Sequence, residues 1–214
     1  MKYWLFSILT AALAYCFGNL DTMAIASNFV FRTNLRRLGK NNAWLSNFYR
    51  VYGIKGFLKL ALVELVKDAI PLLIGGWLFS SGKNSEVGHA LAAFCLVLGR
   101  MYPVLSGFRG SYAAAALCVS ALFINFSMGA AVTAAVVLIA FLTRYLALGT
   151  LAGAAALVAT AILVLENGLA TRLCILIALL LLLKILPAIA RISSRREPRL
   201  SLEKDITYKF DEKF

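Results

Sequence analysis

The chain is poor in charge, and the charge that it has is mostly of one sign. Charged residues make up 15% of its 214 residues, with 22 lysines and arginines, 10 aspartates and glutamates and a single histidine. A soluble domain of this size carries more charge and fewer apolar residues. Hydrophobic residues here reach 61%, and the mean hydropathy is +0.82. The composition therefore excludes an ordinary soluble domain and predicts a polytopic membrane protein.

The sequence also lacks the cysteine spacing of a metal site and the cleavage site of a signal peptide. The four cysteines lie in apolar stretches without the spacing of metal ligands and are interpreted as small packing residues: Cys16, Cys95, Cys118 and Cys174. His89 falls at the end of an apolar stretch, on the predicted outer side. The first apolar run lacks the small-residue cleavage site of a signal peptide, so we expect it to persist as a membrane span. We expect no metal and no cofactor.

Long apolar runs are what the chain has in abundance. About 20 apolar residues cross the hydrocarbon core of a bilayer. The stretch 111–165 divides at two breaks, one at Asn125, Ser127 and Gly129 and one from Arg144 to Gly149. The candidate spans are 3–20, 57–80, 88–106, 112–126, 129–146, 148–165 and 168–190. We predict an all-α membrane helix bundle of about seven transmembrane helices, with six as the alternative.

The basic residues gather in alternate loops. Residues 32–55, 100–109, 144 and 191–199 carry most of them, whereas the opposite loops hold only Lys2, Lys83 and Arg172. This positive-inside pattern places the N-terminus outside and the C-terminus in the cytoplasm, and argues against nucleic acid as the partner. The excess also suits anionic lipid headgroups or a phosphorylated ligand. We expect a single integral membrane domain over 1–192 and a charged cytoplasmic tail over 193–214.

One apolar stretch, 57–80, contains three charged residues within five positions: Glu64, Lys67 and Asp68. A charge near the bilayer centre costs roughly 2.5–3.5 kcal/mol on insertion scales, so these side chains are expected to avoid lipid. Three- and four-residue spacings meet on one helix face. Two interpretations stay open: a neutralised pair that locks the helix into the bundle, or a polar wall beside a substrate pocket.

Three basic, polar segments are predicted on the cytoplasmic face. They are 39–50, 99–112 and 143–145. Amide, hydroxyl and guanidinium groups bind phosphate through charge-assisted hydrogen bonds, and a Gly-Ser turn that opens a helix presents backbone N–H groups to an anion. An ordinary turn at the membrane surface is the alternative for 39–50. The convergence of the three segments predicts an anion site.

These segments resemble the motifs of the acyl-phosphate:glycerol-3-phosphate acyltransferases, integral membrane enzymes of the bacterial inner membrane. The family pattern Gly-Ser-Gly-Asn-x-Gly-Ala-Thr-Asn-x-x-Arg falls on 39–50, where Gly39, Asn42, Asn47 and Arg50 agree and Ser46 replaces a threonine. Its Asp-x-x-Lys-Gly falls on residues 64–68. Its Gly-His-x-Phe-Pro-Val-x-x-x-Phe-Lys-Gly-Gly-Lys-Gly falls on 99–113, and Thr-Arg-Tyr-x-Ser on 143–147. The resemblance covers nearly the whole chain.

The sequence departs from the family motifs at positions that the family uses to bind phosphate and substrate. Its second-motif histidine is Arg100 here, and its Gly-Gly-Lys-Gly loop is replaced by Gly110-Ser111-Tyr112-Ala113. A tyrosine brings one donor and no charge, so it does not replace an ammonium against phosphate. A turn that needs positive φ at the family glycines strains Ser111 or Ala113. The His-x-x-Asn-Ile pattern of the last span is lost at residues 185–189.

The resemblance implies an acyltransferase of phospholipid biosynthesis that uses acyl phosphate, or another acyl donor, and glycerol 3-phosphate or a related phosphorylated polyol among membrane lipids. It implies catalytic positions at Ser46, Asn47 and Arg50. The phosphate-binding positions that it implies are Arg36, Asn42, Lys67, Arg100, Arg109, Gly110, Ser111 and Arg144. Because motif residues are lost, we expect weak or absent activity or a shifted substrate. One alternative is a catalytically inactive relative that binds lipid or phosphate headgroups and scaffolds or regulates a membrane partner. The other is a small transporter or other membrane protein whose resemblance misleads.

Overall fold

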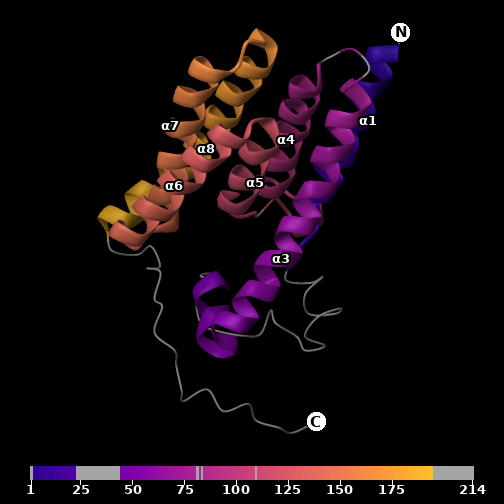
Figure 1. Ribbon diagram of the computed structural model, residues 1–214. Helices are drawn as coiled ribbons and strands as arrows, with labels where there is room; N and C mark the ends of the chain where they lie inside the picture. The colour runs from indigo at the N-terminus through magenta and orange to yellow at the C-terminus, as the bar shows by residue number, and fades with distance from the viewer. Residues whose placement is uncertain (1, 23–43, 81, 83, 109, 195–214) are drawn as a thin grey trace, which may run out of the picture.

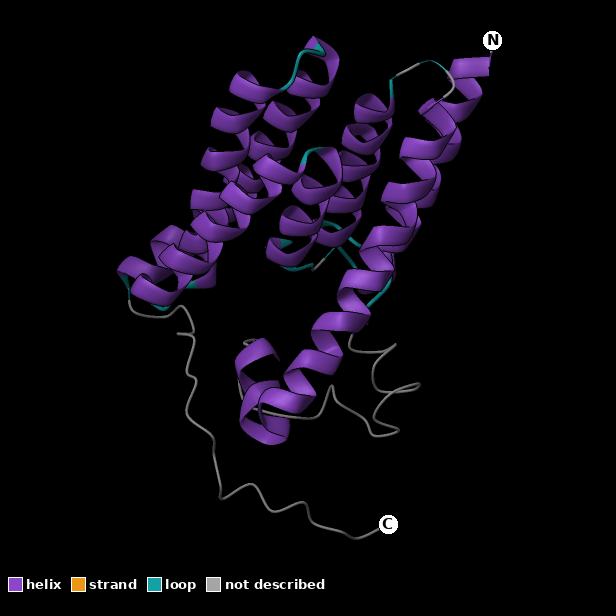
Figure 2. Cartoon of the chain, viewed as in Figure 1, coloured by secondary structure: helices purple, strands orange, loops and turns teal. Residues whose placement is uncertain are grey.

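The computed structural model describes the chain except for residues 1, 23–43, 81, 83, 109 and 195–214. All regular structure in the described residues is helical (Figure 2). The α-helices, with a 3-10 turn named η3 between α4 and α5, are α1 (Lys2–Asn19), α3 (Trp44–Ser80), α4 (Ser85–Met101), η3 (Val104–Ser106), α5 (Ala114–Ile124), α6 (Phe126–Thr143), α7 (Leu146–Val164) and α8 (Gly168–Ser193).

The helices match the seven predicted spans one by one. The long apolar stretch divides where polar residues interrupt it: Asn125 caps α6 by accepting a hydrogen bond from the Ser127 backbone N–H at 3.0 Å, and Arg144 ends α6 in the left-handed region. By length and composition alone, helices α6, α7 and α8 are long and apolar enough to cross a membrane. Helix α5, and α1 from Trp4 onward, are apolar but shorter. The predicted all-α membrane bundle is confirmed.

The bundle has two sides joined by α4. Figure 1 shows α1 and α3 on one side, α6, α7 and α8 on the other, and α4 and α5 between them. Helix α4 packs against α1, α3, α5 and α8. The beginning of α1 and the end of α8 lie at opposite ends of the bundle, as an odd number of spans requires. The predicted direction, with the N-terminus outside, stays a prediction.

Glycines allow α4 to lie directly against its neighbours. A Cβ on Gly99 would stand 2.5 Å from the Tyr15 carbonyl oxygen of α1, and one on Gly88 would stand 2.2 Å from the Gly75 carbonyl oxygen of α3. In a membrane, helices associate largely through such close packing, because lipid is as apolar as the side chains it replaces. These two glycine contacts therefore set how near α1 and α3 come to α4.

Helix α3 has an apolar outer face and a polar inner one. Its exposed large side chains recur at helical spacing and include Leu58, Leu62, Leu65, Leu73 and Trp77. Its charged triplet at residues 64, 67 and 68 is buried instead. Lipid on one side and protein on the other explains this division, since a charge is tolerated only where protein shields it.

Two boundaries differ from the predicted ones by five residues or more. Helix α3 begins at Trp44 rather than at 57, with a kink at Gly53 (φ 63°, ψ −165°), a conformation open essentially to glycine alone. Leu45, Phe48 and Tyr52 have helical spacing, which explains the extra turns before the kink. Helix α4 ends at Met101 rather than at 106, because Pro103 disfavours a helical residue before it.

Candidate active site

Four charged side chains meet where α3 packs against α4. Lys67 Nζ lies 3.0 Å from Asp68 Oδ1 and 3.8 Å from Glu64 Oε1, and the Arg100 guanidinium of α4 pairs with Glu64. Glu64 is 4% exposed, Lys67 5% and Asp68 0%. We call these four residues the charge cluster. It holds two carboxylates and two cations, so it is neutral overall, and its burial confirms that these groups avoid lipid.

Arg100 connects three helices. Besides its contact with Glu64 of α3, its Nη1 donates to Thr22 Oγ1 at 3.0 Å and to the Leu20 carbonyl oxygen at 3.4 Å, both just beyond the end of α1. The guanidinium is well suited to this arrangement, since it presents five donors in a rigid plane. Arg100 therefore binds the ends of α1 and α4 to the charged face of α3.

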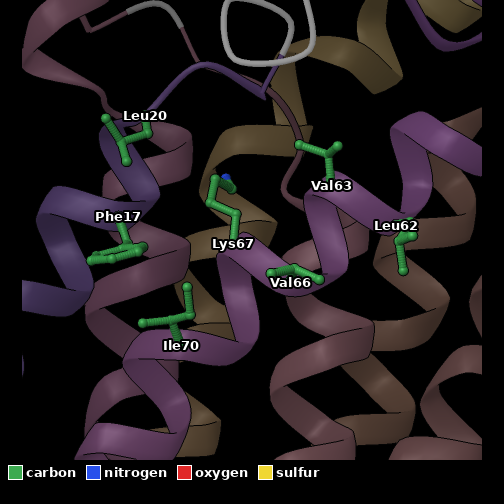
Figure 3. A pocket seen from close by; sticks show the side chains of 7 residues that line it. All are labelled: Phe17, Leu20, Leu62, Val63, Val66, Lys67 and Ile70. Atoms are coloured by element: carbon green, nitrogen blue, oxygen red, sulfur yellow. The ribbon is translucent and has the colours of Figure 1, made fainter. Parts of the chain in front are cut away.

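An apolar groove reaches the side-chain methylenes of Lys67, a member of the charge cluster. It has a volume of about 410 Å³ and lies between α1 and α3. Figure 3 shows Phe17 of α1 and Leu20, which follows α1 directly, across from Lys67 and Ile70 of α3. Lys67 is the charged residue among its described lining residues, which are otherwise aliphatic or aromatic. This composition suits a chain of methylene groups, while the Lys67 ammonium itself is buried in the charge cluster.

The loop between α4 and α5 passes close to the end of α4. A Cβ on Gly110 would stand 2.1 Å from the Arg100 carbonyl oxygen, so only glycine fits there. Tyr15 of α1 donates its hydroxyl to the Tyr102 carbonyl oxygen at 3.0 Å, and Ser111 Oγ accepts a hydrogen bond from the Ala113 backbone N–H at 3.3 Å. Gly110 and Ser111 thus lie on the turn that opens α5, beside Arg100.

One residue of this turn has a left-handed backbone conformation although it is not glycine. Ala113, the residue before α5, has φ 55° and is 3% exposed. An L-residue in this region carries a steric cost of roughly 1–2 kcal/mol that glycine avoids. The strain expected from the sequence is therefore present, at Ala113.

Replacing Ala113 with glycine is expected to raise the free energy of unfolding by up to about 1 kcal/mol, because relief of strain exceeds the added freedom of the unfolded chain. Thermal unfolding of the purified protein in detergent measures this. Ala114→Gly, one residue into α5, is the matched control and should destabilise by a similar amount. A lower stability for Ala113→Gly would contradict the argument.

Two cations of α8 contact the residues on either side of this loop, and neither was among the predicted site residues. Lys184 Nζ donates to the Met101 carbonyl oxygen at 2.9 Å and lies 4.6 Å from the centre of the Tyr102 ring. Arg191 donates to the Tyr112 hydroxyl at 3.0 Å. Their seven-residue spacing places both on one face of α8. Two cations on one face of an apolar span were the signal that could have revealed them.

The other predicted site residues fall into three groups. Arg144 is exposed at the end of α6, on the side of the bundle away from α1 and α3 (Figure 1), with φ 60°. Residues 36, 42 and 109 lie outside the described residues. Ser46, Asn47 and Arg50 belong to the first turns of α3, before the kink, and their side chains lie outside the described part. Their predicted functions stay predictions.

His89, the chain's one histidine, has a structural environment. Its Nδ1 lies within hydrogen-bonding distance of the Phe123 carbonyl oxygen, in the last turn of α5, where no intrahelical donor reaches. Its ring also stands edge-on to Phe123, and it fills the space that the missing side chain of Gly76 leaves on α3. His89 therefore joins α3, α4 and α5 near the end of the bundle that lies away from the charge cluster.

Comparison with known proteins agrees with this arrangement. A family model described as glycerol-3-phosphate acyltransferase matches residues 8–195. The chain belongs to this family. The glycerol-3-phosphate acyltransferase of Thermoanaerobacter pseudethanolicus is 28% identical over 149 residues, which is 70% of this chain and 73% of the relative. That of Burkholderia thailandensis is 30% identical over 148 residues, 69% of this chain and 71% of the relative.

Solved structures of the glycerol-3-phosphate acyltransferase family share the fold. The crystal structure of PlsY (YgiH), an integral membrane glycerol 3-phosphate acyltransferase, in its glycerol 3-phosphate form superposes with a TM-score of 0.71 at 21% identity, covering 91% of this chain and 96% of that one. The lysophosphatidic acid form gives 0.72 at 19% identity, covering 92% and 97%. The predicted family membership and integral membrane location are confirmed.

Proposed function

We propose that this protein transfers an acyl group from acyl phosphate to the hydroxyl of glycerol 3-phosphate or a related polyol phosphate. The observation that carries the proposal is the apolar groove that ends at Lys67, beside the charge cluster. An acyl chain would lie in the groove with its phosphate head toward the end of α4 that carries Arg100, where the Lys67 ammonium is buried in the charge cluster. Membership of the family and PlsY structures that hold glycerol 3-phosphate and lysophosphatidic acid support this substrate class.

The reaction needs no covalent intermediate with the protein. The hydroxyl oxygen of the acceptor attacks the acyl carbonyl carbon, a new ester C–O bond forms, and the C–O bond to phosphate breaks. The leaving phosphate, or a protein carboxylate, takes the hydroxyl proton. With glycerol 3-phosphate as acceptor the products are lysophosphatidic acid and inorganic phosphate. Such a site works chiefly by bringing two anions together and stabilising charge in the transition state.

We expect the rate to be low. Lys67 and Arg100 each face a carboxylate in the charge cluster, and Ser111 and Tyr112 stand where the family motif has glycine and lysine. Removing one well-placed donor from a transition state typically costs on the order of a hundred- to a thousand-fold. Lys184 and Arg191, which reach the same loop from α8, supply positive charge near it.

Arg144→Gly tests the part of the proposal that rests on the family motif alone, since Arg144 lies at the end of α6 and not beside the groove. Arg144 ends α6 at φ 60°, a conformation that glycine adopts without strain, so the change removes a cation without disturbing the helix end. We expect formation of radiolabelled lysophosphatidic acid from acyl phosphate and glycerol 3-phosphate to fall about tenfold, the effect of losing about 1.4 kcal/mol of transition-state stabilisation. The unfolding temperature should not fall and should rise slightly, since glycine relieves the left-handed strain here as it does at Ala113. No product above background from the wild-type protein would refute the proposed activity.

A second candidate function is a catalytically inactive relative that binds phosphate-bearing lipid headgroups. The neutrality of the charge cluster favours it, because both of its cations already have a carboxylate partner. The two candidates differ in one measurement. An inactive relative would retain lysophosphatidic acid during purification, detectable by mass spectrometry, and would form no new product with acyl phosphate.

A further inference from the structure

Glu64 stands in the charge cluster where an anionic ligand would stand. Its Oε1 contacts the Arg100 guanidinium and lies 3.8 Å from Lys67 Nζ, so one carboxylate bridges two cations on different helices. Its second oxygen, Oε2, has no hydrogen-bond partner among the described residues. A bound phosphate or carboxylate would meet the same two cations.

The charges around the bridge leave no surplus for a ligand. Lys67 is already 3.0 Å from Asp68 Oδ1, and the four groups of the charge cluster sum to zero. Arg100 has other partners besides Glu64: Thr22 Oγ1 and the Leu20 carbonyl oxygen, both neutral acceptors beyond the end of α1. Without the Glu64 charge, Arg100 would therefore keep its two neutral partners, and Asp68 would be the one carboxylate left in the charge cluster for two cations.

We propose that Glu64 is a specificity-determining residue that masks Arg100, so that a phosphorylated acceptor binds only by displacing the Glu64 carboxylate from the guanidinium. The inference rests on the proposed function for the identity of the acceptor. By this inference, one side chain, that of Glu64, keeps the affinity of the site for a phosphate head low. It also predicts that neutralising this side chain makes the site a better phosphate receptor.

Glu64→Gln is the direct test, since glutamine keeps the length and the Oε1 acceptor and removes the charge. The charge cluster then carries one net positive charge. We expect the dissociation constant for glycerol 3-phosphate to fall about tenfold and that for inorganic phosphate to fall in parallel. Isothermal titration of the purified full chain in detergent, without acyl donor, measures both.

Two further variants separate masking of Arg100 from a general change of charge. Glu86→Gln removes one carboxylate from the first turn of α4, at the other end of that helix, and should bind glycerol 3-phosphate like the wild type. In an Arg100→Gln background, Glu64→Gln should lose most of its tenfold gain. A gain of similar size without Arg100, or with Glu86→Gln, would overturn the proposal.

A second variant at the same position covers the case in which Glu64→Gln does not fold. If Glu64→Gln is not recovered as a folded protein, Glu64→Asp withdraws the carboxylate from Arg100 by one methylene and should tighten glycerol 3-phosphate binding about threefold. Unchanged or weaker binding in a folded Glu64→Gln or Glu64→Asp variant would refute the masking.

The outcomes also distinguish this inference from the proposed function. Tighter binding in Glu64→Gln with no lysophosphatidic acid formed by any variant would support the masking and refute the acyltransferase activity. Turnover by the wild type with no tighter binding in Glu64→Gln would support the activity and refute the masking.

Discussion

Replacing Arg100 with glutamine is expected to lower the free energy of unfolding by about 3–5 kcal/mol, the usual cost of removing one partner of a buried ion pair. The change leaves two buried carboxylates, Glu64 and Asp68, with one cation, Lys67. Asp68 Oδ2 and Glu64 Oε2 already have no hydrogen-bond partner among the described residues. Thermal or denaturant unfolding in a fixed detergent provides the measurement.

The double variant Arg100→Gln with Glu64→Gln is the control for this effect. It removes one charge of each sign and leaves Lys67 with Asp68. It should recover most of the lost stability, since no uncompensated charge stays buried, which is the main cost of breaking such a pair. Arg172→Gln, near the start of α8, should change stability by less than about 0.5 kcal/mol. If Arg100→Gln is as stable as the wild type, the charge cluster does not hold the bundle together.

Replacing Gly99 with alanine is expected to reduce kcat/KM for acyl transfer about a hundred-fold. The new Cβ would stand 2.5 Å from the Tyr15 carbonyl oxygen and 3.2 Å from the Gly18 Cα, both backbone atoms of α1. Backbone cannot rotate away as a side chain can, so α1 and α4 must separate. Arg100 follows directly in sequence, and a misplacement of about 1 Å near reacting groups can cost on the order of a hundred-fold.

Gly168→Ala is the matched control for Gly99→Ala. Gly168 is the first residue of α8, and a Cβ there meets nothing within 4 Å. Acyl transfer by this variant should equal that of the wild type. If Gly99→Ala transfers acyl groups at the wild-type rate, the spacing of α1 and α4 does not control the site.

Local sequence was enough to predict the helices and the inward face of α3. Apolar length determines where a chain can span a bilayer, and Asn125 and Arg144 interrupt the apolar run where α6 begins and ends. The spacing of Glu64, Lys67 and Asp68 placed them on one face, because helical geometry is fixed within a few residues. The left-handed residue at Ala113 followed from glycine positions in the family motif.

The sequence by itself determined the membrane class, the spans, the family and the burial of the α3 charges, all of which depend on composition or on neighbours within one or two turns. Only the tertiary structure decided that Arg100 pairs with Glu64, 36 residues away, and that Lys184 reaches Met101, 83 residues away. The glycine contacts of α4 set where it lies against α1 and α3, and the partner of Lys184 depends on where α8 packs against α4. Helical spacing carries no information over such separations. Whether a cation meets substrate or its own carboxylate is therefore a property of the packed bundle.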